Sequence, residues 1–443
     1  MNEPAPTAGD IAALLKAQQR RLVAHLARSL GLAHLALAED AVQVAALQAL
    51  QSWPGAGWPD NPAGWLYRVA RHHALDQLRR EQHQLPLPDD DSLPLPAPMP
   101  AQRLAGELDD DELALLFVAC HPALPVASQV ALAMRAVAGL ELAAIAEGLF
   151  TNESALAQRL ARARALLQGQ RLTLPAGAEL PARREAVLIT LQLMFAAGLR
   201  ASGRQVVPGA EVAGAGRTGD EGPAGPALSS APLQLCWEAI RLARALAAHP
   251  HAAHADADAL AALLLLHGAR LSGRLDEAGQ IVPLPGQDRD RWDAGLVRLG
   301  LAHLQAAQRG QQLSRWHLLA GIAAEHALAP SYARTDWPSI VRYYELLLQQ
   351  DPSAAPRLGH AIALAEGGSP AQALALLERL LPDTPEALRA HTLAALSRAH
   401  ERLAAWPAAI DRLKEAVACA PSAADARWLT TRLQALQQQA AGH

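Results

Sequence analysis

Arginine and tryptophan side chains gather between positions 53 and 80, and both residue types can bind nucleic acid. The stretch 59–81 reads PDNPAGWLYRVARHHALDQLRRE. Guanidinium groups bind phosphate with paired hydrogen bonds, and indole rings stack on unpaired bases. The residues of these two kinds are Trp53, Trp58, Arg68, Arg71, Arg79 and Arg80. They predict a surface for a polyanion, and the alternative is the solvated side of an ordinary amphipathic helix.

A helix beginning at Pro62 is expected to position these arginines. Asn61 is a favourable N-cap. Proline is suited to the first helical position because the N–H that it lacks has no partner inside the helix there. Helical spacing gives this segment one apolar side, made of Leu66, Ala70, Ala74 and Leu78. One side can therefore pack on a core while the arginines on the other side meet phosphate.

Two further helices are expected before this one, over residues 10–30 and about 38–53. In the second, Asp40, Gln43 and Leu47 share one face. Pro54 and the glycines after it should end that helix and leave Trp53 and Trp58 in an aromatic loop. Residues 10–83 thus form a first helical domain.

The composition indicates an all-α protein of several domains. The 443 residues are too many for a single core, and 51% are hydrophobic but only 4% aromatic, with alanine and leucine dominant. The formal net charge of −4 means that any nucleic-acid surface must be local. A polar N-terminus and the lack of a long apolar run predict a cytoplasmic protein with no membrane span.

The sequence offers little support for an enzyme, a cofactor or a metal site. Cys120, Cys236 and Cys419 are far apart and lack the spacing of zinc ligands. His249, His251 and His254 lie in a polar alanine-rich stretch that is better interpreted as an exposed loop. There is no glycine-rich phosphate loop and no nucleophile motif.

A second helical domain is expected over residues 109–172, after a linker. The linker, 84–108, is rich in proline and aspartate and should be extended and flexible between domains. The segment LELAAIAEGLFTNESALAQRLARARALL from residue 140 has the spacing of a helix-turn-helix, with Asn152 capping its second helix. An αα-hairpin with no partner is the alternative.

The remaining residues, 183–443, are predicted to form a helical extension. A glycine-rich insertion, 203–230, has no helical pattern and is expected to be disordered. From about 335 to 443, three helices end at Pro352, Pro385 and Pro421, a spacing close to the roughly 34-residue period of tetratricopeptide repeats. Ala373 and Ala409 stand where small residues let paired helices approach.

The order of these parts resembles that of an extracytoplasmic-function sigma factor of bacterial RNA polymerase. AEDAVQVAALQAL is similar to sigma region 2.2, the stretch 59–81 to regions 2.3 and 2.4, and IAEGLFTNESALAQRLARARALL to region 4.2. CHPAL at 120–124 and QDRDRW at 287–292 extend the resemblance to the subgroup with a large C-terminal tetratricopeptide-like extension. FAAGL at 195–199 departs from the Phe-Asn-Glu-Gly-Tyr motif of that subgroup, and the glycine-rich insertion is also unusual.

The resemblance implies partners and roles for particular residues. Core RNA polymerase would be bound through its β′ clamp and β flap, with Asp40, Gln43 and Leu47 on the clamp. The −10 promoter element would meet Trp53, Trp58, Arg68, Arg71, Arg79 and Arg80. The −35 element would meet Asn152, Glu153, Ser154, Gln158, Arg159, Arg162 and Arg164. The acidic linker would lie in the RNA path of the polymerase, and the extension would bind an unknown regulator.

Two other functions remain open at this point. The chain would fit a DNA-binding transcription regulator with a tetratricopeptide sensor that never docks on polymerase. It would also fit a helical scaffold whose helix-turn-helix is only structural. Neither the promoter, the inducing signal, the oligomeric state nor the sign of regulation by the extension follows from the sequence.

Overall fold

The computed structural model describes residues 7–31, 34–82, 111–149, 151–167, 179–202, 231–274, 276, 282–310 and 312–441. Within these ranges all regular structure is helical and no strand occurs, which confirms the all-α prediction. The expectations for the linker 84–108 and the insertion 203–230 lie outside the described residues. The chain divides into two compact units, Met1–Met194 and Phe195–His443.

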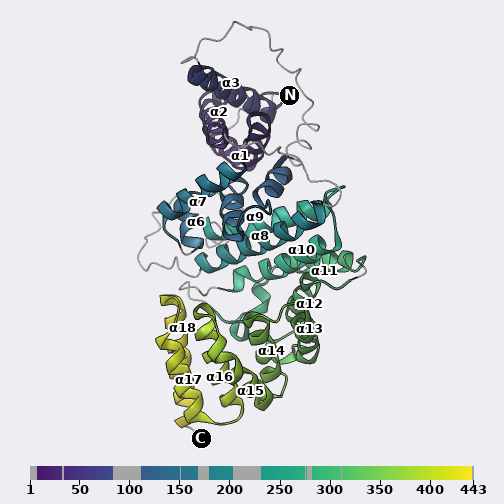
Figure 1. Ribbon diagram of the computed structural model, residues 1–443, viewed down its shortest axis with the longest axis vertical. Coiled ribbons are helices and arrows are strands. Elements are labelled where there is room, and N and C mark those ends of the chain that lie inside the picture. The colour runs from purple at the N-terminus through teal and green to yellow at the C-terminus, as the bar shows by residue number, and fades with distance from the viewer. Residues whose placement is uncertain are drawn as a thin grey trace. The chain divides into compact units, whose positions relative to one another are not determined.

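The first unit begins with three helices that pack on one another, α1 (Ala8–Leu30), α2 (Leu35–Ala56) and α3 (Pro62–Gln82) (Figure 1). Thr7 and Asp10 form a capping box at the start of α1, which satisfies backbone donors that have no partner inside the helix. The core between the helices is apolar and includes Ile11, Leu22, Leu26, Leu35 and Leu66. This arrangement agrees with the three helices predicted from sequence.

The end of α2 differs from the prediction. The helix continues to Ala56 and contains Pro54, so Trp53 is a helical residue rather than part of a loop. Pro54 lacks a backbone N–H and so removes one hydrogen bond from the helix. Because it lies in the last turn of α2, only two further helical residues follow it. The helix ends at Gly57, whose φ of 81° suits glycine and whose N–H donates to the Trp53 carbonyl at 2.9 Å.

A second group of helices follows in the same unit: a segment over 111–119, then α5 (Val126–Ala136), α6 (Leu142–Gly148) and α7 (Glu153–Leu166). Asn152 caps α7 by accepting the Ala155 N–H at 2.8 Å, as predicted. The inward side of α7 is also as predicted, with Leu156, Leu160, Ala163 and Leu167 buried. Helix α8 (Glu179–Ser202) begins in this unit.

Ion pairs connect the two helix groups of the first unit. The Asp111 side chain is buried and accepts hydrogen bonds from His25 and Arg28 of α1. Arg135 of α5 pairs with Glu39 of α2 at 2.6 Å. Buried charges need such partners, because an unpaired one would cost several kcal/mol.

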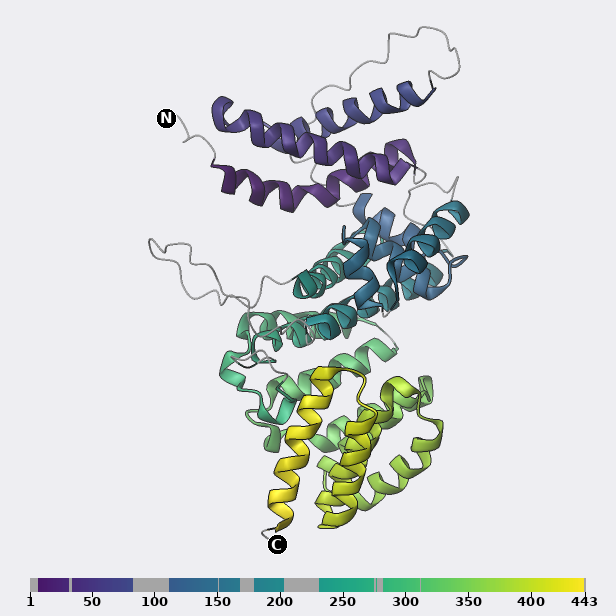
Figure 2. The ribbon, with the colours of Figure 1, turned by 90° about the vertical axis from the view of Figure 1, so that its left-hand side faces the viewer.

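The second unit is also built from helices, α9 (Ala231–Ala248), α10 (Ala255–Gly268), α11 (Ala294–Ala307) and α12 (Arg315–Leu328) (Figure 2). Helix α10 packs against the other three and carries the apolar run Leu260–Leu266, which is buried throughout. Between α10 and α11 the chain makes three short 3-10 turns, η3 (Leu271–Gly273), η4 (Leu284–Gly286) and η5 (Arg289–Arg291). The turn η6 (Tyr332–Arg334) follows α12.

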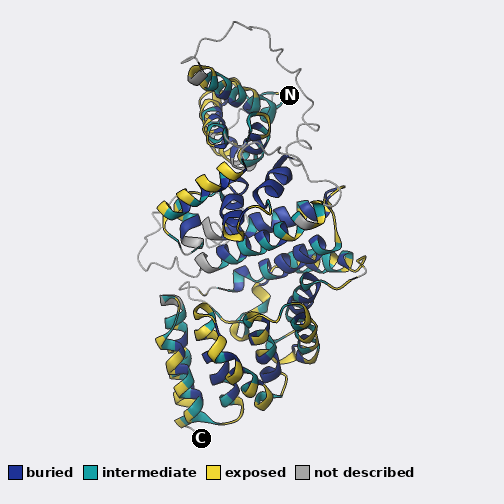
Figure 3. Cartoon of the chain, in the orientation of Figure 1, coloured by how far each residue is buried: buried dark blue, intermediate teal, exposed yellow. Residues whose placement is uncertain are grey.

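The last part of the second unit repeats one structural motif. Consecutive helices pack as hairpins in which a mostly buried side alternates with exposed residues (Figure 3); these are α13 (Trp337–Gln350) with α14 (Ala354–Glu366), α15 (Pro370–Leu380) with α16 (Glu386–Arg402), and α17 (Trp406–Ala418) with α18 (Ala423–Ala441). The first helices of the hairpins begin 33 and 36 residues apart. Ala373 and Ala409 are fully buried, as expected where helices approach closely.

Candidate nucleic-acid interface

Helix α3 has the local structure needed to present a polar face. The side-chain oxygen of Asn61 accepts the Gly64 N–H at 3.0 Å, which is the predicted N-cap. A Cβ at position 64 would lie 2.7 Å from Asn61 Nδ2, so glycine there makes room for the cap. Leu66, Ala70 and Ala74 are buried on the apolar side, which fixes the rotation of the helix.

The arginines of α3 lie on the side away from the core. Arg68, Arg79 and Arg80 are exposed, and Arg71 is half-buried. Asp76 lies 3.8 Å from Arg79 Nη1 and 3.3 Å from His72 Nε2. Such exposed pairs are weak, so a phosphate could replace Asp76 as the partner of Arg79. The prediction that the arginines face solvent is confirmed for Arg68, Arg79 and Arg80, and Arg71 is only partly exposed.

The tryptophans of this region form an aromatic cluster. The Trp53 ring lies 5.4 Å from that of Trp58 and 5.3 Å from that of Trp65. Trp53 is only 2% exposed, because the longer α2 carries it into the core. The expectation that Trp53 stacks on a base is therefore corrected: its ring packs against protein, whereas Trp58 and Trp65 are half-buried and keep some accessible surface.

A separate stripe on α2 combines polar and apolar residues that are all exposed. Asp40, Gln43 and Leu47 share this side as predicted, and Leu47 is 59% exposed. Leu50, which the sequence reading missed, continues the stripe at 37% exposure. Its signal was available: it follows Leu47 by three residues and so falls on the same helical face. Leu47 and Leu50 thus place two exposed apolar side chains beside polar groups on one face of α2.

The start of α7 presents a second set of polar side chains. Asn152, Glu153, Ser154 and Gln158 are all exposed. The Asn152 side-chain oxygen accepts both the Ala155 N–H and the Ser154 hydroxyl at 2.8 Å, so it is engaged in capping. The Asn152 amide group and the other side chains face solvent at a helix N-terminus, where the backbone dipole favours anions.

The three arginines of α7 differ in their surroundings. Arg162 is exposed, and Arg159 is half-buried. Arg164 is half-buried beside Glu39 and Arg135, and its Nε is buried without a hydrogen bond. Burial lowers the pKa of Arg164, and burial likewise raises the pKa of Glu39 against the pull of Arg135. The expected role of Arg164 as a DNA anchor stays a prediction, and its half-buried place beside Glu39 leaves it less accessible than Arg162.

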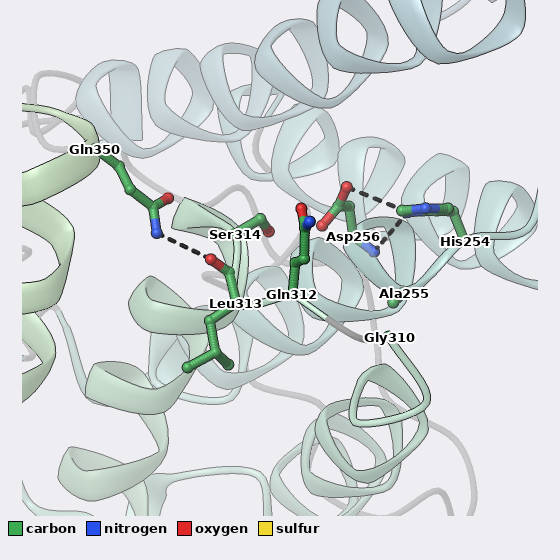
Figure 4. A pocket seen from close by; sticks show the side chains of 8 residues that line it. All are labelled: His254, Ala255, Asp256, Gly310, Gln312, Leu313, Ser314 and Gln350. Carbon is green, nitrogen blue, oxygen red and sulfur yellow. Dashed lines mark hydrogen bonds and ion pairs between the residues drawn. The ribbon is translucent and has the colours of Figure 1, made fainter.

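The second unit contains a polar cavity of about 570 Å³ (Figure 4). It lies between the start of α10, the loop before α12 and the end of α13. The labelled side chains are held by the protein: Gln350 donates to the Leu313 carbonyl at 2.9 Å, and His254 pairs with Asp256 at 3.2 Å while capping α10. These internal bonds explain the histidine-rich loop without a ligand.

The other candidate reactive groups have structural surroundings. In the part of the chain that the structure describes, no three histidine, cysteine or acidic side chains lie close enough to hold a metal ion. Cys120 donates to the Thr190 hydroxyl, and burial raises the pKa of Cys120 and of Cys236 to about 12. Thiols with such high pKa values are poor nucleophiles at neutral pH. None of the described helices is long and apolar enough to cross a membrane.

Comparison with known proteins identifies the class of the first domain. Residues 15–84, which include α2, α3 and most of α1, match the family Sigma-70 region 2. This match supports a sigma-70 family sigma factor, a class of proteins that act in transcription initiation. Residues 183–308 match a second family, described as a family of unknown function (DUF6596). No solved structure matches the chain.

A relative extends the comparison to nearly the whole chain. The uncharacterized protein R00370 of Rhizobium meliloti (strain 1021) is 34% identical over 420 residues, which is 92% of this chain and 92% of that protein. The chain therefore belongs to the same family as the Rhizobium protein, and a sigma-70 region 2 domain is its N-terminal part.

Proposed function

We propose that this protein is an extracytoplasmic-function type sigma factor that directs core RNA polymerase to promoters and carries a regulatory helical extension. The match of residues 15–84 to Sigma-70 region 2 carries this proposal. The exposed sides of α2 and α3 supply the two surfaces that such a function needs. One surface binds polymerase and the other binds DNA.

The polymerase contact is assigned to the α2 stripe. Asp40 and Gln43 offer polar groups, and Leu47 and Leu50 offer apolar area that water would otherwise surround. Fully burying an exposed leucine contributes roughly 1.5–3 kcal/mol, so covering the exposed parts of these two side chains contributes a fraction of that for each. The stripe would dock on the β′ clamp of the polymerase, and the helices over 111–167 would contact the β flap.

The promoter contacts are assigned to two helices. Arg68, Arg79 and Arg80 of α3 would bind phosphates of the −10 element, with Arg71 beside them and Trp58 available to stack on an unpaired base. In the second helix group, α6 and α7 would act as a helix-turn-helix. The side chains at the start of α7 would read the −35 element, and Arg159 and Arg162 would hold its backbone.

The extension, residues 183–443, is proposed to be a regulatory and protein-binding part. Its α13–α18 hairpins support a tetratricopeptide-like array, because their spacing and buried alanines fit that repeat. An array of this kind offers a long surface to a protein partner.

Binding to core polymerase tests the proposal directly. The full-length protein is mixed with core enzyme and the complex is separated by size-exclusion chromatography. Asp40→Ala with Leu47→Ala should weaken binding at least tenfold, whereas Gln48→Ala, an exposed change on another side of α2, should not. Equal binding by all three proteins would refute the assigned surface.

The same experiment separates the competing functions. A DNA-binding regulator that never docks on polymerase would bind promoter fragments alone and show no complex with core enzyme. A helical scaffold would bind neither. Complex formation with the wild-type protein, lost in the α2 variant, is expected only of a sigma factor.

A further inference from the structure

Two arginines of the second unit lie against one tryptophan between α10 and α11, and a third arginine lies near them. The Cζ atoms of Arg270 and Arg289 lie 5.4 Å and 4.5 Å from the ring centre of Trp292, which is 8% exposed. Arg274 follows Arg270 by one turn, at the end of η3. We call Arg270, Arg274 and Arg289 the arginine cluster. A Cβ at Gly273 would lie 3.1 Å from the Trp292 ring, so glycine lets the chain pack closely here.

Among the described residues, no carboxylate is paired directly with the arginine cluster. Arg270 donates to the Gln287 amide oxygen at 3.4 Å, and Arg289 donates to the carbonyls of His326 and Ala329. Asp425 acts on Arg274 only at longer range. The cluster therefore brings together three cations and neutral acceptors.

Two donor groups of the cluster also lack a hydrogen-bond partner among the described residues. Arg274 Nε and Arg289 Nη2 are buried and make no hydrogen bond there. Buried guanidinium groups are normally paired, since an unsatisfied charged donor costs more than a neutral one. Unsatisfied groups of this kind in a folded protein need an explanation, and a bound ion is one of the recognised ones.

The pKa values of the arginine cluster and of the neighbouring histidines also favour an anion at this place. The pKa of Arg270 is lowered to about 10, first by burial and then by the charges of Arg274 and Arg289. Burial, with the charges of Arg270 and Arg274, lowers the pKa of His267 to about 3. Burial, with the charges of Arg270 and Arg289, lowers the pKa of His326 to about 4, so both imidazoles are neutral near pH 7. An anion at this place would relieve the repulsion between the guanidinium groups.

We propose that the arginine cluster is a binding site for a small polyvalent oxyanion of the phosphate class, such as phosphate, pyrophosphate or a terminal phosphate group. Guanidinium forks match the oxygens of phosphate, and up to three forks suit a di- or trivalent anion better than a single carboxylate. Arg270 and Arg289 lie against the Trp292 ring, which limits their freedom and prepares them for a ligand. The site belongs to the extension and does not depend on the proposed sigma function.

Calorimetry with the full-length protein tests this site. Sodium pyrophosphate and inorganic phosphate are titrated at low ionic strength, with chloride at equal ionic strength as reference. The wild type should bind pyrophosphate at one site and more tightly than phosphate. Arg289→Gln should weaken binding at least tenfold, and Arg291→Gln, an exposed arginine two residues away, should leave it unchanged.

Further variants and ligands make the result decisive. Arg270→Gln provides a second loss-of-binding variant should Arg289→Gln fail to fold, and Arg289→Lys tests whether the fork matters beyond its charge. Adenosine diphosphate, compared with pyrophosphate, distinguishes a phosphate carried on a nucleotide from the free anion. The proposal is wrong if the wild type binds pyrophosphate no better than chloride, or if Arg291→Gln weakens binding as much as Arg289→Gln.

Discussion

The arginines of α3 and those of the arginine cluster lie in opposite surroundings. Arg68, Arg79 and Arg80 are exposed on a regular helix, whereas Arg270 and Arg289 pack against Trp292 between helices. Exposed guanidinium groups spaced along a helix suit a long polyanion and are sensitive to salt. Converging, half-buried groups suit one small anion. The same residue type can therefore serve two kinds of ligand, and its packing decides which.

The largest expected effect is on promoter affinity when the exposed arginines of α3 are replaced. Replacing Arg68, Arg79 and Arg80 by alanine should weaken promoter binding by the holoenzyme on the order of 100-fold near 0.1 M salt, and reduce the salt slope by about 3. Fluorescence anisotropy on fragments that the holoenzyme selects from genomic DNA measures both. Replacing the exposed Arg298, Arg357 and Arg389 of the second unit removes the same charge as a control. An equal loss in the control would show that net charge alone matters.

The next effect concerns His326, a buried histidine beside the arginine cluster. His326 has a folded-state pKa of about 4, below its ordinary value of 6.5, so the unfolded chain takes up its proton first as pH falls. Stability should therefore be lost as pH falls from about 6.5 towards 4, by on the order of 2 kcal/mol at pH 5. Urea unfolding at pH 7 and pH 5 measures this loss. It should shrink in His326→Gln but not in His391→Gln, which changes an exposed histidine; identical losses would contradict the burial argument.

A smaller effect is expected in α7, where an exposed and a half-buried arginine lie on one helix. Arg162 of α7 is exposed, while Arg164 lies beside Glu39. Arg162→Ala should weaken binding to the selected promoter fragments several-fold, because it removes a proposed phosphate contact. Arg164→Ala should lower the stability of the first unit and change DNA affinity less. The reverse order of affinities would assign the DNA-facing side of α7 differently.

The smallest expected effect is on stability, when the N-cap of α3, the helix with the exposed arginines, is removed. Asn61→Ala removes the α3 N-cap and should lower the free energy of unfolding by about 1 kcal/mol. Promoter binding should change little once the protein is folded, because the arginines lie further along the helix. Thermal unfolding and anisotropy, measured on one preparation, separate the two effects. A large loss of affinity in folded protein would mean that the start of α3 itself contacts DNA.

The sequence predicted most of the fold because helices leave strong local signals. Apolar spacing located α1, α3 and α7, and capping residues such as Asn61 and Asn152 marked their starts. The end of α2 was wrong because Pro54 was interpreted as a helix breaker, although a proline in a last turn can be tolerated. That error also placed Trp53 in a loop when it lies in the core.

The site was predicted in part. Exposure of Arg68 and Arg79 follows from helical periodicity, so it could be read from the chain. The partial burial of Arg164 could not be predicted from the sequence, because it depends on Glu39, which is far away along the chain. The arginine cluster was invisible for the same reason: Arg270 and Arg289 meet only because two turns fold over Trp292.

Transcription by reconstituted holoenzyme tests the central claim most directly. Core RNA polymerase is combined with the full-length protein on the fragments it selects, and run-off transcripts are measured. We expect transcripts with a defined start that require the wild-type protein and are strongly reduced by the combined Asp40→Ala and Leu47→Ala changes. No increase over core polymerase alone, with core enzyme that is active with another sigma factor and with this protein shown to be folded, would contradict the proposed function.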